Sequence, residues 1–304
     1  AREADNNVSL YTNNKQEFEY FTKNRESIKL KGLKIHEDIR VFDTLEDILP
    51  ADVVLLVVPA QEVRQVCTEL NGVLNKQTYI ILCSKGVELE SGLMMHEIAE
   101  SVLKDHSIAV LSGPTFAHEV AQKMPTAALI AHKEMTTARF LASTLGSDCF
   151  RLYPSSDIVG AEIGGAVKNV IAIAVGIAMA KKMGDNARAA IITRGLAEMA
   201  RLGVALGADH DTFLGLSGVG DLVLTCTSKA SRNFSFGFKK GGGNIDFDDT
   251  LLTEGAHTVL ALMRLADMME IEMPLSRAVH RVLYENANIE NEIHALLSRP
   301  FKVE

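Results

Sequence analysis

The sequence predicts an α/β fold in which a mostly parallel sheet is followed by an all-helical domain. Short β-rich apolar runs alternate with helical patterns in the first half, which is typical of a parallel sheet flanked by helices. From about Ser155 onward the apolar residues follow helical periods instead. Because 304 residues are too many for one ordinary core, we expect two domains, at 1–154 and 155–304.

Six runs of the first half are expected to be strands. They are 8–11, 39–42, 53–58, 78–83, 107–111 and 127–131. Pro59, Ser84 to Gly86, and Gly113 with Pro114 follow three of these runs directly. Polar and helix-breaking residues therefore gather at the carboxyl ends of the strands, where open α/β sheets bind their ligands.

Composition excludes several classes of function. The formal net charge of −8 leaves no electrostatic footprint for nucleic acid, although a local cluster of donors could still hold a small phosphate. The four cysteines, Cys67, Cys83, Cys149 and Cys226, are scattered without metal-site spacing, which predicts neither disulfides nor a metal site. The first residues show no signal-peptide pattern, so we expect a cytoplasmic protein.

One charged side chain interrupts the apolar stretch 163–180. Lys168, with Asn169 beside it, lies near the middle of this stretch, which also contains three glycines. These features favour a buried helix over a membrane span. A buried ammonium must be paired, reach water or lose its proton through a lowered pKa, and the last option would make Lys168 a base. The alternative is a surface lysine whose head snorkels into solvent.

Downstream, a glycine-rich turn at 216–220 leads into a helix with Asp221 in its first turn. Asp221 shares a helix face with Thr225, four residues on. One interpretation of Asp221 is a helix cap or dipole partner. The other is that it orients Lys168 for proton transfer.

Two further segments each allow two interpretations. Ser231, Arg232 and Asn233 place a hydroxyl, a guanidinium and an amide in successive positions, which suits a phosphate but also an ordinary polar helix end. The run 239–244 (KKGGGN) is either a mobile loop or an inert surface turn.

Together, several segments resemble the NAD(P)-dependent glycerol-3-phosphate dehydrogenase family over nearly the whole chain. They are SGPTFAHE (112–119), GGAVKNV (164–170), ITRGLAEM (192–199), GVGDLVLTCT (218–227) and SRN (231–233). The resemblance implies a Rossmann-type nucleotide-binding domain and a helical substrate domain. It also implies an oxidoreductase that interconverts sn-glycerol 3-phosphate and dihydroxyacetone phosphate with NAD or NADP, within carbohydrate metabolism and in supply of phospholipid biosynthesis.

The resemblance also implies roles for individual residues. Lys168 takes the position of the proton acceptor, with Asp221 as its catalytic partner. Substrate-binding positions are Lys85, Gly113, Thr115, Lys168, Asp221, Ser231, Arg232 and Asn233. Cofactor-binding positions are Asn13, Lys85, Ala117, Arg232, Leu252 and Glu254. The loop 239–253 is then a candidate lid over the nicotinamide side.

This chemistry suits the residues. Oxidation of a secondary alcohol removes the hydroxyl proton as hydride leaves the carbon, and a lysine whose pKa burial has lowered toward about 7 to 8 can accept that proton. In the reducing direction the ammonium protonates the nascent alkoxide. A second cation, Lys85, close to Lys168 would lower the pKa of Lys168 further.

The sequence departs from the family at its start. The family opens with a strand and a GxGxxG-type loop that cradles the pyrophosphate, and no such motif occurs in the 304 residues. Asn13 matches the adenine-ribose position, so the first strand and glycine loop are expected before residue 1, and the chain as given is expected to start inside the Rossmann unit.

A missing first strand predicts a gap in the sheet. The runs 8–11 and 53–58 should lie about 9.6 Å apart, twice the inter-strand spacing, and should not pair directly. Dinucleotide affinity of the chain as written is expected to be strongly reduced.

Two alternative functions stay open at this stage. One is a related two-domain hydroxy-acid dehydrogenase, against which the phosphate-type cluster at 231–233 speaks. The other is a truncated, non-catalytic nucleotide-binding scaffold. We expect a small phosphorylated substrate and a homodimer as for many soluble enzymes, and Asn13 leaves the choice between NAD and NADP open.

Overall fold

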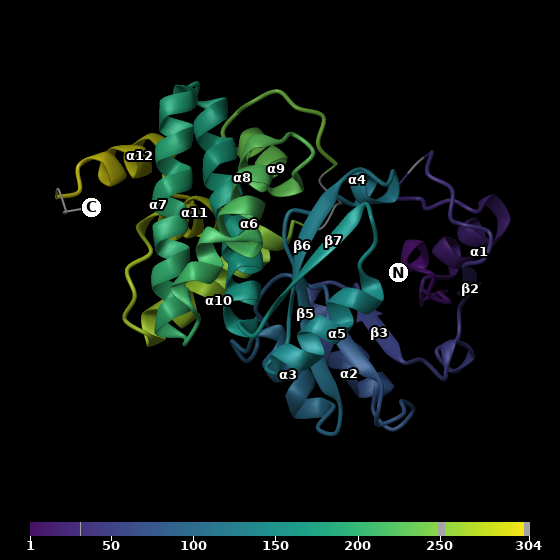
Figure 1. The fold of residues 1–304 in the computed structure, drawn as a ribbon. Helices are drawn as coiled ribbons and strands as arrows, with labels where there is room; N and C mark the ends of the chain where they lie inside the picture. Colours follow the sequence, from purple (N-terminus) through teal and green to yellow (C-terminus); the bar gives the residue numbers. More distant parts are fainter. Residues whose placement is uncertain (31, 249–252, 301–304) are drawn as a thin grey trace. The chain divides into compact units, whose positions relative to one another are not determined.

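The computed structural model describes residues 1–30, 32–248 and 253–300 (Figure 1). The chain separates into two compact units. The sheet unit contains 1–58, 62–83 and 96–158, and the helical unit contains 59–61, 84–95 and the chain from 159 onward. Two short segments that precede residue 154 therefore belong to the helical unit.

The sheet unit is built on five strands in the order β3-β4-β5-β6-β7. Their bounds are β3 (Val53–Leu56), β4 (Tyr79–Leu82), β5 (Ser107–Ser112), β6 (Thr126–Ala131) and β7 (Phe150–Ser155). Neighbouring strands are parallel except β5 and β6, which are antiparallel, with Val110 opposite Ala131. The expected Rossmann-like sheet is therefore confirmed, with one reversed strand pair that the sequence analysis did not predict.

Apolar residues explain why these runs form a layered sheet. Ile81, Ala109 and Ile130 on adjacent strands are fully buried, and Leu141 of a helix packs on the same cluster. The helices of this unit are α1 (Lys15–Asn24), α2 (Val63–Leu70), α3 (Met95–Val102), α4 (Ala117–Ala121) and α5 (Met135–Leu145), with single turns at Arg2–Ala4 and Glu46–Ile48. The core holds the carboxyl ends of the strands, and the loops that follow them, in fixed positions.

Strand β7 is absent from the sequence-based expectation. Its segment FRLYPS contains Pro154, which lacks the N–H that a central strand needs. The structure places β7 at the edge of the sheet, hydrogen-bonded on one side only, to β6. A proline is tolerated there, and Arg151 lies 5.3 Å from the centre of the Tyr153 ring on the exposed face.

The two N-terminal strands form a separate parallel sheet. β1 (Ser9–Tyr11) pairs with β2 (Arg40–Phe42), and Leu10 lies opposite Val41. Within the described residues, β1 does not pair with β3, which confirms the expectation that these two strands are not direct neighbours. The spacing of about 9.6 Å, taken from the general strand separation, stays a prediction.

The helical unit surrounds the long helix α6 (Ile158–Ala180). Its other helices are α7 (Gly184–Ala205), α8 (Asp221–Thr227), α9 (Arg232–Lys240), α10 (Glu254–Met268), α11 (Pro274–Tyr284) and α12 (Ile289–Leu297), with short turns at Ala60–Glu62, His210–Leu214 and Leu216–Gly220. Among the described helices, α6 alone is long and apolar enough to cross a membrane, but 83% of its apolar window is buried inside the protein. The prediction of a buried core helix is confirmed.

Glycines allow neighbouring helices to approach α6 closely. A methyl group at Gly176 would overlap the backbone of Phe234 on α9, and one at Gly237 would overlap the backbone of Ile173. Gly195 on α7 lies against the Ile171 side chain in the same way. These contacts fix α9 and α7 on α6, and they hold the residues at the start of α9 close to the middle of α6.

Helix α11 begins on a buried carboxylate of α7. Glu198 accepts hydrogen bonds from the backbone N–H of Leu275 at 2.6 Å, and from the N–H and hydroxyl of Ser276 at 3.1 and 2.9 Å. Burial raises the pKa of Glu198, and these three hydrogen bonds oppose that rise. Glu198 therefore satisfies N–H groups that the first turn of a helix leaves without partners.

Replacing Glu198 with alanine is expected to destabilise the protein by about 3 kcal/mol, because buried N–H groups lose a charged acceptor. Denaturant unfolding measures the change. Glu290→Ala, which removes an exposed partner of Lys181, is the matched control and should change stability far less. Equal effects of the two variants would contradict the capping role.

Candidate active site

The candidate site is centred on one buried carboxylate that pairs with two lysines. Lys168, 6% exposed, lies on α6, and Asp221, 1% exposed, is the first residue of α8. Lys168 Nζ forms an ion pair with Asp221 Oδ1, and Lys85 Nζ donates to Asp221 Oδ2 at 2.7 Å. Thr225 Oγ1 donates to the backbone carbonyl oxygen of Asp221 at 2.6 Å, a contact within the first turn of α8.

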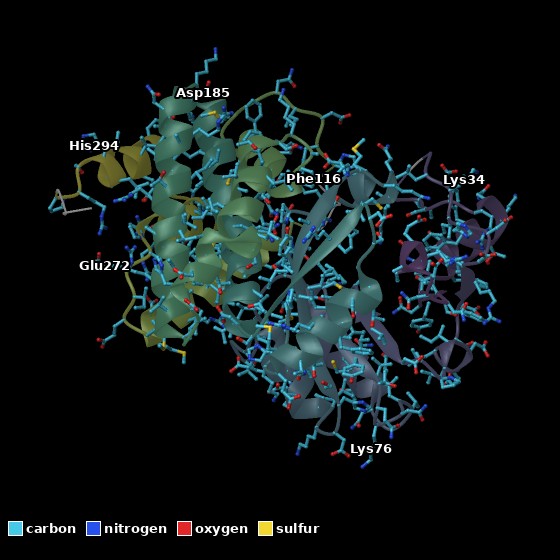
Figure 2. All side chains as sticks on the ribbon, in the orientation of Figure 1. Lys34, Lys76, Phe116, Asp185, Glu272 and His294 are labelled. Carbon is cyan, nitrogen blue, oxygen red and sulfur yellow. The ribbon has the colours of Figure 1, made fainter. Side chains whose placement is uncertain are left out.

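Burial distinguishes Lys168 from an ordinary surface lysine. Lys76, for example, extends from the surface (Figure 2), where its side chain is 77% exposed and pairs with Asp105. The snorkelling alternative for Lys168 is therefore wrong, because its ammonium is enclosed and paired. The N-cap position of α8 belongs to Gly220, while Asp221 lies in the first turn of the helix and its carboxylate pairs with both lysines.

Electrostatics separates the roles of the two lysines. Burial and, second to it, the charge of Lys85 lower the pKa of Lys168 to about 7, against the opposing attraction of Asp221. Burial also acts to lower the pKa of Lys85, but Asp221 outweighs it and holds that pKa above its usual value. The pKa of Asp221 is lowered by both lysines in spite of its burial. Of these three groups, Lys168 is therefore the one whose pKa lies near neutral pH.

The three residues at the start of α9 have different surroundings. Ser231 Oγ accepts the N–H of Phe234 at 3.2 Å and so caps the helix. Asn233 is buried, whereas Arg232 is exposed. Ser231 is therefore a helix cap, as expected for an ordinary polar helix end. Of the three residues, Arg232 is the exposed one, and its guanidinium could bind a phosphate.

A hydrogen-bond chain links the neighbour of Lys168 to the start of α10. Asn233 Nδ2 donates to Asn169 Oδ1 at 2.9 Å, and Asn233 Oδ1 accepts the N–H of Gly255 at 2.9 Å. A Cβ on Gly255 would lie 2.7 Å from both the Asn169 carbonyl and Asn233 Oδ1, so only glycine fits there. Asn169 belongs to none of the residue roles expected from the sequence, in which its position next to Lys168 is its one distinguishing feature.

Glu254, the first residue of α10, completes this part of the site. Burial raises the pKa of its carboxyl, while Arg232, Lys85 and Lys168 act to lower it. Four proposed site residues of the helical unit, Lys168, Asp221, Lys85 and Glu254, thus share one electrostatic environment. Leu252, also named from the sequence, lies outside the described residues, as does part of the candidate lid 239–253.

The remaining named residues belong to the sheet unit. Gly113 and Thr115 follow β5, Ala117 is the first residue of α4, and Asn13 is exposed just before α1. Gly113 has φ +144°, and a Cβ on it would lie 3.0 Å from Ala128 Cα. The backbone therefore carries no side chain at Gly113, at the carboxyl end of β5, where ligands of open α/β sheets bind.

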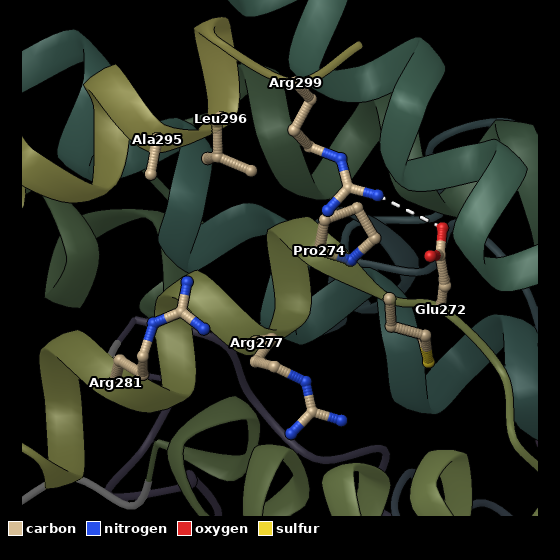
Figure 3. A pocket seen from close by; sticks show the side chains of 8 residues that line it. Glu272, Pro274, Arg277, Arg281, Ala295, Leu296 and Arg299 are labelled. Atoms are coloured by element: carbon tan, nitrogen blue, oxygen red, sulfur yellow. Dashed lines mark hydrogen bonds and ion pairs between the residues drawn. The ribbon is translucent and has the colours of Figure 1, made fainter. Parts of the chain in front are cut away.

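Two cavities of the helical unit are separate from this cluster. One of about 260 Å³ is lined by Arg277, Arg281 and Arg299 (Figure 3), and a larger one of about 510 Å³ is mainly apolar. Each of the three guanidiniums already pairs with a carboxylate, of Asp267, Glu292 and Glu272 respectively. Lys168, Asp221 and Lys85 line neither cavity, so neither belongs to the lysine cluster.

The described cysteines and acidic residues offer no competing centre. All four cysteines are free, and burial raises the pKa of Cys67 to about 11, so its thiol stays protonated. No group of three or more His, Cys, Asp or Glu side chains among the described residues could hold a metal ion. Proton transfer at Lys168 is the chemistry that this part of the structure supports.

A Rossmann-like sheet unit followed by a helical unit with a buried lysine of lowered pKa is the arrangement of a two-domain nucleotide-dependent dehydrogenase. Two family models match the chain: the N-terminus of NAD-dependent glycerol-3-phosphate dehydrogenase over residues 1–138, and its C-terminus over 157–294. The chain belongs to this family, as the sequence resemblance predicted.

Individual relatives agree with the family models. The chain is 44% identical over 288 residues to a glycerol-3-phosphate dehydrogenase (NAD(P)+) of Parvibaculum lavamentivorans, covering 93% of this chain and 86% of the relative. A glycerol-3-phosphate dehydrogenase structure from Coxiella burnetii superimposes with a TM-score of 0.92 at 34% identity, over 98% and 93% of the two chains. D-mandelate dehydrogenase shares the fold alone, at 12% identity and a TM-score of 0.63 over 97% and 94% of the two chains. The hydroxy-acid alternative is therefore only a distant likeness.

Proposed function

We propose that this chain interconverts sn-glycerol 3-phosphate and dihydroxyacetone phosphate with NAD or NADP, and that Lys168 is its acid–base residue. The observation that carries the proposal is the buried Lys168–Asp221–Lys85 cluster. Burial and, second to it, the charge of Lys85 lower the pKa of Lys168 to about 7 against the attraction of Asp221, so that this amine would lose its proton near neutral pH.

The proposed reaction uses these groups in turn. In the oxidising direction neutral Lys168 accepts the proton of the C2 hydroxyl while hydride leaves C2. In the reducing direction the Lys168 ammonium protonates the oxygen at C2. Asp221 orients the Lys168 amine, and Lys85, which keeps its charge, stabilises negative charge that develops on the substrate oxygen.

The residues present fit a nicotinamide cofactor and a phosphate. The bare backbone at Gly113 and the partly buried carboxyl of Glu254 are suitable contacts for NAD or NADP, which supplies or accepts the hydride when bound. We assign Asn13, Lys85, Ala117, Arg232, Leu252 and Glu254 to the cofactor. The exposed Arg232, at the N-terminus of α9, would bind the substrate phosphate.

Several finer features extend the proposal. Lys85, Arg232 and Glu254 of the helical unit would contact the cofactor, and the part of 239–253 that follows α9 would act as a lid. The product sn-glycerol 3-phosphate would serve phospholipid synthesis in the cytoplasm, and the enzyme would be a homodimer, the commonest symmetric assembly.

The test is dihydroxyacetone phosphate-dependent oxidation of NADH and of NADPH, followed by absorbance. We expect turnover with the phosphorylated ketone and none with an unphosphorylated 2-oxo acid. Turnover with the 2-oxo acid alone would support the hydroxy-acid alternative, and turnover with neither would support a non-catalytic scaffold.

The rate is expected to depend on pH in opposite senses for the two directions. Oxidation needs neutral Lys168, so kcat/KM for sn-glycerol 3-phosphate should rise as pH passes through about 7. Reduction needs the ammonium, so its rate should fall over the same range. Initial rates measured in both directions from pH 5.5 to 9 check this; parallel profiles would exclude Lys168 as the titrating group.

A further inference from the structure

Lys85 lies on a loop that is bound to the helical unit. The loop 84–95 connects β4 to α3, two elements of the sheet unit, yet it groups with the helical unit together with the segment 59–61. It is closed internally by an antiparallel bridge between Val87 and Met94 and by a 3.0 Å hydrogen bond from the Glu88 N–H to the Leu93 carbonyl. These two contacts close the part of the loop that follows Lys85.

Gln61 makes two further contacts with this loop through a single side chain. Its Nε2 donates to the Val87 carbonyl at 2.9 Å, and its Oε1 accepts the Leu89 N–H at 2.9 Å. The side-chain amide thus pairs with the loop backbone much as a neighbouring strand would. Neither the proton transfer nor the proposed ligand contacts use Gln61.

Arg264 makes the next contact, from α10. Its Nη1 donates to the Leu89 carbonyl at 2.8 Å, so the N–H of Leu89 is held by Gln61 and its carbonyl by Arg264. Arg264 lies on the same helix that begins with Glu254. Leu89, on the loop of Lys85, is therefore bonded to the helix that begins with Glu254.

The residue after Lys85 shows how tightly the loop is seated. Gly86 has φ +153°, and a Cβ on it would lie 2.9 Å from the Ala60 Cβ and 3.3 Å from the Thr258 hydroxyl. The backbone beside Lys85 thus packs between the Ala60 turn and α10, with no room for a side chain. Movement of this loop would move the Lys85 ammonium directly.

We propose that Gln61 and Arg264 are positioning residues for the reaction. By hydrogen-bonding the N–H and the carbonyl of Leu89, respectively, they hold the 84–95 loop so that Lys85 reaches Asp221. The inference rests on the proposed function for its kinetic consequence, while the loop placement itself can be measured without turnover.

Loss of these hydrogen bonds to Leu89 would change the electrostatic surroundings of Lys168. Lys168 is surrounded by Lys85 from the loop, by Asp221 and Cys226 from α8 and by Glu254 from α10, with Arg232 of α9 facing Glu254. Of these, Lys85 alone lies on the loop that Gln61 and Arg264 hold. If it withdraws, its repulsion on the Lys168 ammonium weakens while the attraction of Asp221 remains, so the pKa of Lys168 rises.

The experiment compares Gln61→Ala, Arg264→Met and the double variant with the intact chain. We expect the double variant to lose about tenfold in kcat/KM, as hydrogen bonds of ordinary strength would give. The midpoint of the pH profile for oxidation should move to higher pH. Arg264→Lys, which keeps a donor, should recover part of the loss, and Gln65→Ala, which removes only an exposed contact with Glu69, is the control.

Amine acetylation followed by mass spectrometry supplies a readout that needs no turnover. Lys85 should react faster in the double variant, relative to Lys76 as internal reference. Unchanged acetylation of Lys85, or lower activity and thermal stability with an unmoved pH midpoint, would overturn the proposal. Absence of turnover in the intact chain would instead remove the proposed function and leave the acetylation test of the loop in force.

Discussion

Replacing Lys168 with alanine is expected to lower kcat for dihydroxyacetone phosphate reduction by about 10²- to 10⁴-fold, the usual contribution of a positioned acid–base group. The variant should fold, because Asp221 keeps Lys85 as a partner at 2.7 Å and no buried charge is left alone. KM should change much less than kcat, because the phosphate contact proposed for Arg232 is untouched.

Two matched variants make this test specific. Lys168→Arg keeps the positive charge but cannot release its proton near neutral pH, so it should be as inactive as the alanine variant in the oxidising direction. Lys76→Ala removes a surface lysine that is 77% exposed and should leave kcat unchanged. Turnover near the wild-type rate in Lys168→Ala would eliminate Lys168 as the base.

Asp221→Asn is expected to have the largest combined effect on stability and rate. It leaves two buried lysines without their shared carboxylate, and removing one partner of a buried ion pair typically costs about 3–5 kcal/mol. The attraction that now opposes the fall in the pKa of Lys168 also disappears, so that pKa should fall further. Chemical denaturation at pH 7 and the pH profile for oxidation measure the two effects.

The sign of the pH dependence is specific to this carboxylate. The pKa of Asp221 is lowered in the folded state, so its contribution to stability is present above the ordinary carboxyl pKa and is lost as pH falls through the folded value. The difference in unfolding free energy between the intact chain and Asp221→Asn should therefore shrink in acid. Asp105→Asn, which removes the exposed partner of Lys76, should give a far smaller difference at neutral pH. Equal behaviour of the two variants would contradict the buried-pair interpretation.

Local patterns were sufficient for most of the fold. Six apolar runs became strands close to their expected bounds, and the change of period near Ser155 lies close to the division of the chain at 158 and 159. Strand β7 was not predicted from the sequence, because Pro154 weakens its strand pattern. Only the edge position of β7 in the sheet makes that proline acceptable. The reversal of β6 against β5 has no local signal, because strand direction depends on the path of the chain between strands.

The sequence by itself determined that a lysine lies in an apolar helix and that an aspartate begins another, and the order of the motifs determined the family. Only the tertiary structure decided what those groups do. Lys85 and Asp221 are 136 residues apart, and Asn233 and Asn169 are 64 apart, yet both pairs are in hydrogen-bond contact. Local propensity cannot report such contacts, because they arise when separate helices and loops bury their apolar faces together. The same packing removes water from Lys168, and that removal is the first cause of its lowered pKa.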